Sequence, residues 1–262
     1  MKSVWSIFKF VFMDNLKSTW AIAYTLLLAV MSYALIYFTG SFTRSVVSIM
    51  NVVILVAPLV ATMMTSMYYY NKADFIYLVL TQPVSRSQAF LGIYLGLAVM
   101  LFLSILLGLG GGILAGISHV ENPALMSTLI GLGAMLSLVF SALAMFISVA
   151  SNDKLKGIGL ALFIWLFMAA IYDGLTLMYF IAFSEYPIEE HAIALSLLNP
   201  IDLCRIFIML QLDISALMGY SGAVFQKFFG TGKGLLISSG ALFTWVLLPI
   251  IGLMIKADKK DF

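Results

Sequence analysis

Long stretches with few or no charged residues dominate this sequence and limit most strongly what it can fold into. Six of them are long enough to cross a lipid bilayer as a helix, which takes roughly 20 mostly apolar residues. Of the 262 residues, 63% are hydrophobic and only 10% are charged, whereas ordinary globular domains are about 25% charged. A soluble globular protein is thereby excluded, and the sequence predicts an all-α integral membrane protein with six transmembrane helices. The predicted spans are residues 18–43, 45–70, 91–118, 124–150, 157–183 and 234–255.

The distribution of Lys and Arg predicts how the chain is oriented, because basic residues gather in the short cytoplasmic loops of membrane proteins. If the N-terminus is inside, ten of the 14 basic residues lie on the cytoplasmic side and four lie outside. Both termini are therefore expected in the cytoplasm, and residues 1–262 are expected to form one transmembrane domain. Residues 1–17 carry lysines beside an aromatic-rich apolar face, which is typical of a helix in the inner membrane interface. An early start of the first span is the alternative.

Residues 184–233 contain an apolar part that is too short between its charges for a seventh span. The uncharged run after Asp213 is 13 residues long, and a seventh span would place the basic C-terminus outside. We therefore expect 184–233 to form an extracytoplasmic layer of short helices between spans five and six. One of these helices is expected to begin at Pro200, because proline is tolerated in the first turn of a helix.

The polar and small residues inside the spans need separate explanations. Asp173 is the one acid well inside a span, and such an acid is by default a candidate functional residue. The alternative is that it is hydrated, or bonded to Tyr172, Thr176 or Tyr179. The glycine pairs of span three are expected to be helix-packing positions; they are Gly92 with Gly96, Gly108 with Gly112, and Gly112 with Gly116.

Catalytic and metal chemistry are not expected of this chain. No His, Cys or Ser–Lys arrangement accompanies Asp173, so an intramembrane enzyme is disfavoured. The 16 methionines could suit Cu(I), but methionine is also a flexible packing residue, and we expect no metal site.

The segment FIYLVL (75–80) lies between spans two and three, on the predicted cytoplasmic side. Six residues cannot cross a bilayer. Asp74 suits a helix N-terminus, and Pro83 ends the segment, so a short helix is predicted over 74–83. It could pack against the inner ends of the spans, or it could fill a groove on a cytoplasmic partner protein.

The stretch DFIYLVLTQPVSRSQAFLGIYLG (74–96), with the plan of the whole chain, resembles the ABC-2 type transporter permeases. The resemblance implies that 74–83 is the coupling helix that docks on an ATPase subunit. It also implies that ATP and Mg²⁺ bind that ATPase, that this chain binds no cofactor, and that it is not itself an enzyme. The residues expected to contact the ATPase are Asp74, Phe75, Leu78, Val79 and Arg86.

A narrower resemblance covers residues 171–179 and 199–230, which are similar to the permeases of NosDFY-type transporters. Such transporters help to assemble the copper sites of nitrous oxide reductase. The resemblance implies a homodimer in the bacterial inner membrane, a NosF-like ATPase dimer in the cytoplasm, and a NosD-like periplasmic protein on the outer helices. The expected periplasmic contacts are Asp202, Arg205, Phe207 and Asp213. The lipid bilayer is the remaining partner, and no nucleic acid is expected.

The expected function is therefore mechanical: hydrolysis by a partner ATPase moves the permease and supports transport or force transmission. The alternatives are a generic ABC-2 exporter of a lipid, peptide or drug and, less favoured, a secondary transporter that uses Asp173 to couple an ion gradient. The paired repeats common in secondary transporters are not visible in this sequence.

Overall fold

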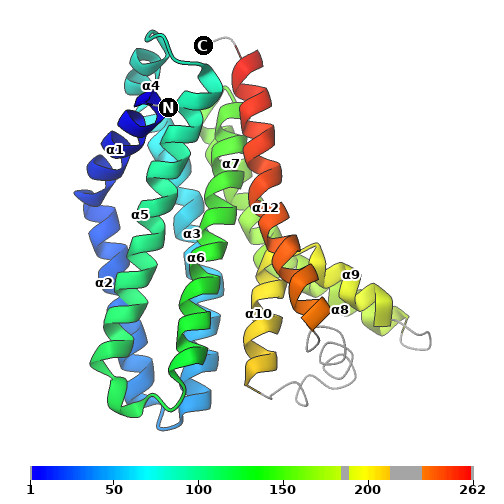
Figure 1. Cartoon of the computed structure of the whole chain (residues 1–262). Coiled ribbons are helices and arrows are strands. Elements are labelled where there is room, and N and C mark those ends of the chain that lie inside the picture. The colour runs from blue at the N-terminus through cyan, green and yellow to red at the C-terminus, as the bar shows by residue number, and fades with distance from the viewer. Residues whose placement is uncertain (1, 184–188, 213–231, 261–262) are drawn as a thin grey trace.

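The computed structural model describes residues 2–183, 189–212 and 232–260, and every regular element among them is a helix. Six helices are long and apolar enough to cross a membrane, which confirms the six predicted spans. They are α2 (Thr19–Phe38), α3 (Phe42–Asn71), α5 (Arg86–Ala115), α6 (Pro123–Ala150), a fifth span made of α7 (Lys154–Leu166), η2 (Phe167–Ile171) and α8 (Tyr172–Ala182), and α12 (Gly232–Lys259). The N-terminus, the C-terminus and the short helix α4 (Ala73–Leu80) lie at the same end of the bundle (Figure 1).

Helices α5 and α6 form the centre of the bundle. In the apolar stretch of each of them, 61% of the residues are buried, against 50% in α3 and 28% in α2. In the fifth span only 6% of such residues are buried, so this span lies at the edge of the bundle and leaves part of its surface for lipid or for another protein.

Glycines on α5 let two helices approach it closely. Helix α1 (Lys2–Leu16) packs along its first half and α2 along its second half. A Cβ atom added at Gly96 would lie 2.7 Å from the Cβ of Val11, and one added at Gly108 would lie 2.8 Å from the Cβ of Leu28. These distances confirm the predicted role of the span-three glycines as packing positions. The extended backbone of Ser18 separates α1 from α2. That α1 lies in the membrane interface stays a prediction.

Helices α9 (Glu189–Leu197) and α10 (Pro200–Gln211) form a pair bent by 114°. The bend lies deep in the bundle, because the indole nitrogen of Trp245, halfway along α12, donates to the carbonyl of Leu197 at 3.2 Å. Helix α10 then packs against α6 and α3 (Figure 1). This differs from the predicted layer wholly outside the spans, and the reason is that Ile201, Leu203 and other apolar residues of α10 belong to the main core. The remaining parts of that layer, 184–188 and 213–231, lie outside the described residues.

Candidate functional site

Helix α4 is the first candidate site, and its residues divide between an inward and an outward face. Ile76 and Val79 are each 3% exposed and join a core cluster with residues of α1, α3 and α5. The ring of Phe75 stacks on that of Phe10 in α1, with centroids 4.6 Å apart. Leu78 is 60% exposed on the opposite side. The helix is therefore fixed to the bundle along one face and bare along the other.

The predicted ATPase contacts fall on both faces. Asp74 is exposed in the first turn, where its negative carboxylate interacts favourably with the positive end of the helix dipole. Val79 points inward, so it holds α4 in place and cannot be a surface contact. Sequence reasoning did not assign Tyr77, which is 51% exposed beside Leu78. Its one distinguishing signal was its polar hydroxyl within an otherwise hydrocarbon run.

Arg86 connects the segment after α4 to the end of the chain. Its guanidinium donates to the backbone carbonyl of Lys260. The Lys260 amine in turn donates to the carbonyl oxygens of Val149, at 2.8 Å, and Ser151, at 3.2 Å. Burial, and then the neighbouring charge of Lys256, lower the pKa of Lys260. The start of α5, the end of α6 and the C-terminus are thus bonded together beside α4.

A second candidate site joins span five to α10 through an ion-pair cluster. One guanidinium nitrogen of Arg205 lies 2.7 Å from a carboxylate oxygen of Asp173 and 3.1 Å from one of Asp202. The predicted partners of Asp173, namely Tyr172, Thr176 and Tyr179, are replaced by this arginine. The side chain of Asp202 is 12% exposed and that of Arg205 is 28% exposed. Both carboxylates therefore pair with Arg205 inside the chain. The contact of Asp202 and Arg205 with a periplasmic protein stays a prediction.

The bend between α9 and α10 is stabilised by side chains that bond free backbone groups. Asn199 caps α10, because its side-chain oxygen accepts from the amide of Ile201 at 3.1 Å. Its side-chain nitrogen donates to the carbonyl of Met168 at 2.9 Å. Met168 lies in η2, a π-helical turn in which the regular hydrogen-bond ladder is interrupted. The hydroxyl of Tyr172 donates to the carbonyl of Leu195 at 2.7 Å. Span five and the bent pair therefore form one bonded unit.

Two other predicted periplasmic contacts remain. Phe207 is half-buried and packs against the main core. Asp213 lies outside the described residues. Among the described residues, no group of three or more His, Cys, Asp or Glu side chains could hold a metal ion.

Two curated proteins are similar to this chain over most of its length. A probable ABC transporter permease protein NosY from Pseudomonas aeruginosa is 29% identical over 237 residues, which cover 84% of this chain and 86% of that protein. The protein of the same name from Stutzerimonas stutzeri is 28% identical over 224 residues, which cover 79% and 81%. No family model matches the chain. The similarity indicates an ABC transporter permease, and with the six apolar helices it indicates a multi-pass protein of the bacterial inner membrane.

Proposed function

We propose that this chain is the membrane subunit of an ATP-driven transporter and that a cytoplasmic ATPase dimer moves it through α4. The observation that carries the proposal is the divided surface of α4: Ile76 and Val79 fix the helix to the bundle, and Leu78 is left exposed. Short helices with exposed apolar anchors bind in grooves of partner proteins. The similarity to ABC transporter permeases supports an ABC ATPase as the partner. ATP and Mg²⁺ would bind the ATPase, and this chain would bind neither.

The contacts of α4 give the motion a route into the bundle. Because Phe75 stacks on α1 and Val79 packs with α5, a displacement of α4 shifts both helices together. Closely packed helices move as rigid bodies rather than deforming. Helix α5 packs along α6, and α6 contacts α10. The motion would therefore reach the bent pair α9–α10 on the far side.

We further propose that this motion supports copper-site assembly in nitrous oxide reductase, together with a NosF-like ATPase and a NosD-like periplasmic protein. The support is the similarity to proteins named NosY. The contact with the periplasmic protein would lie on the part of α10 that holds Phe207, at the far end of the bundle from α4 (Figure 1). Asp213 stays a predicted contact outside the described residues. The ion pairs among Asp173, Asp202 and Arg205 would connect the bent pair to span five, so that the two move together.

A homodimer is part of the same proposal. The fifth span has an exposed side, where additional Cβ atoms at Gly159 or Gly174 would meet nothing within 4 Å. Small residues on an exposed membrane helix allow another helix to approach closely. The mass of the purified complex tests this directly, because it should contain two copies of the chain.

The exposed side chain of Leu78 offers the sharpest test of docking. Leu78→Asp should weaken ATPase binding at least about tenfold, because a charge would replace an apolar anchor at the centre of the interface. The measurement is co-purification of the ATPase with the permease, followed by the copper content of the reductase in the same strain. Leu155→Asp is the control, since Leu155 is 82% exposed at the same end of the bundle but belongs to span five.

Full ATPase retention by Leu78→Asp would refute the docking role of α4. ATPase loss with normal reductase copper would instead refute the copper-site proposal alone. The competing ion-coupled transporter is not favoured, because Asp173 is already ion-paired with Arg205.

A further inference from the structure

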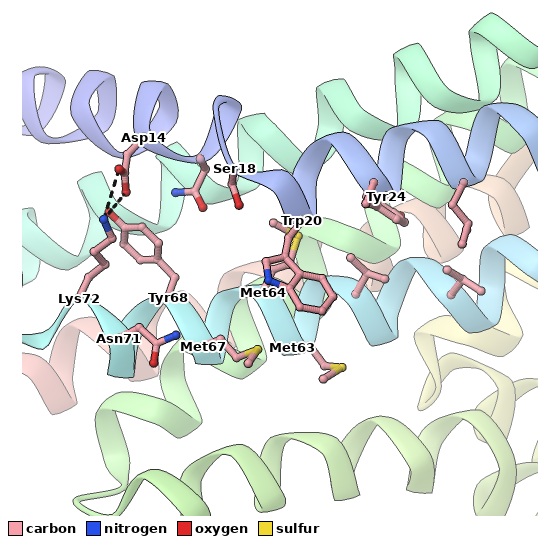
Figure 2. A pocket seen from close by; sticks show the side chains of 15 residues that line it. Asp14, Ser18, Trp20, Tyr24, Met63, Met64, Met67, Tyr68, Asn71 and Lys72 are labelled. Atoms are coloured by element: carbon pink, nitrogen blue, oxygen red, sulfur yellow. Dashed lines mark hydrogen bonds and ion pairs between the residues drawn. The ribbon is translucent and has the colours of Figure 1, made fainter.

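A cavity of about 530 Å³ lies between the α1–α2 junction and α3, and nothing in the proposed mechanism uses it. Its volume is within the range of roughly 300–1,000 Å³ found for small-molecule sites. Figure 2 shows side chains from α1, α2 and α3 converging on it. The cavity is therefore a candidate binding site in its own right.

The lining of this cavity is polar at one end and apolar along the rest. Asp14, Asn15, Ser18, Asn71 and Lys72 gather where α2 begins and α3 ends, which is the level expected for lipid head groups. The apolar part is lined by Trp20, Ala23, Tyr24, Leu27, Val56, Val60, Met63, Met64 and Met67. Methionine side chains are flexible and fit occupants of irregular shape. A ligand with a charged head and a hydrocarbon tail matches this division.

The length and the opening of the cavity match an acyl chain. Val56 lies about 22 Å along α3 from Asn71, at about 1.5 Å of rise per residue, and half of a hydrocarbon core is about 15 Å thick. The cavity thus extends from the head-group level to the middle of the membrane. Trp20 is 70% exposed at its edge and Leu27 is 46% exposed, so a lipid can enter sideways between α2 and α3.

The polar end of the cavity holds a positive charge, a negative charge and a hydroxyl group that can donate a hydrogen bond to a ligand. The amine of Lys72 lies 2.9 Å from a carboxylate oxygen of Asp14. The ring of Tyr68 points toward this pair (Figure 2). Tyr68 is 7% exposed, and within the described part of the chain its buried hydroxyl has no hydrogen-bond partner. A buried hydroxyl without a partner is costly, and a ligand acceptor would remove that cost.

We propose that this cavity binds one phospholipid with a phosphate and a primary ammonium in its head group, taken from the leaflet on the α4 side. The phosphate accepts hydrogen bonds from Tyr68 and Lys72, and the ammonium donates to the carboxylate of Asp14. A purely anionic head group would be repelled by Asp14. A trimethylammonium head group has no N–H to donate to that carboxylate.

The test is native mass spectrometry of the full-length protein in nanodiscs, titrated with phosphatidylethanolamine or phosphatidylcholine. The wild-type protein should retain one phosphatidylethanolamine with at least about tenfold preference. Tyr68→Phe should lower that affinity about tenfold, the effect of losing a hydrogen bond to a charged group. Ala23→Trp should abolish retention by filling the cavity. Ile22 is the adjacent residue, is 57% exposed and does not line the cavity. Ile22→Trp should therefore bind phosphatidylethanolamine as the wild type does.

Three results would overturn the proposal. One is equal retention of phosphatidylethanolamine by Ala23→Trp and the wild type. Another is equal affinity for the two lipids. The third is a photo-crosslinker at position 23 that attaches to a second copy of the chain, which would assign the cavity to a protein contact. Attachment of the crosslinker to lipid would support the proposal. Weaker binding by Tyr68→Phe and Ala23→Trp, together with unchanged binding by Ile22→Trp, would also support it.

Discussion

Asp173 and Arg205 show what a charged side chain requires inside a helix bundle. Asp173 was noted from the sequence as an unusual acid inside a span, whereas Arg205 was expected to contact a periplasmic protein. Their pairing could not be predicted, because the two residues are 32 positions apart and meet only through the bend between α9 and α10. The guanidinium is shared with Asp202, so a single arginine pairs with two carboxylates.

Removing that guanidinium should destabilise the protein. Arg205→Ala should cost about 1–3 kcal/mol, which lies between the small value of exposed ion pairs and the roughly 3–5 kcal/mol of fully buried ones. Asp173→Asn should cost less, because Asp202 still pairs with Arg205. Thermal unfolding in detergent measures both. An Arg205→Ala protein as stable as the wild type would show that the ion pairs do not hold α10 to span five.

At the scale of helices, the apolar pattern predicted which segments are helical more reliably than which way they face. All six residues at 75–80 are apolar, so periodicity could not separate inward Val79 from outward Leu78. The start of α10 at Pro200 was predicted correctly from proline chemistry. Its depth was not, because depth is set by Trp245 and Met168, whose hydrogen bonds to the bend join distant parts of the chain.

The contact between α2 and α5 provides a test at this scale. A Cβ atom at Gly112 would overlap the hydroxyl of Ser32 and lie 2.5 Å from the carbonyl oxygen of Ala29. Gly112→Ala should therefore destabilise the protein by about 1–3 kcal/mol, the usual cost of overpacking. Gly111→Ala is the matched control, because an added Cβ there meets nothing within 4 Å. It should be neutral or slightly stabilising, since alanine favours a helix. Equal stability of the two variants in thermal unfolding would show that α2 can move away from α5 without cost.

At the scale of the whole molecule, the six spans were predictable because a bilayer demands long apolar segments whatever the packing. The structure places both termini and α4 at one end of the bundle, as expected from the basic residues (Figure 1). That this end faces the cytoplasm remains a prediction. In the proposed assembly, a second copy would bind the exposed side of the fifth span and an ATPase would bind the exposed face of α4.

Thiol labelling of Leu78→Cys in intact membranes tests the central claim most directly. The native Cys204 is fully buried and should not react, so the signal comes from position 78 alone. We expect the thiol to react with an impermeant reagent only from the cytoplasmic side, and to become protected when the partner ATPase is bound. Labelling from the periplasmic side, or equal labelling with and without the ATPase, would contradict the account.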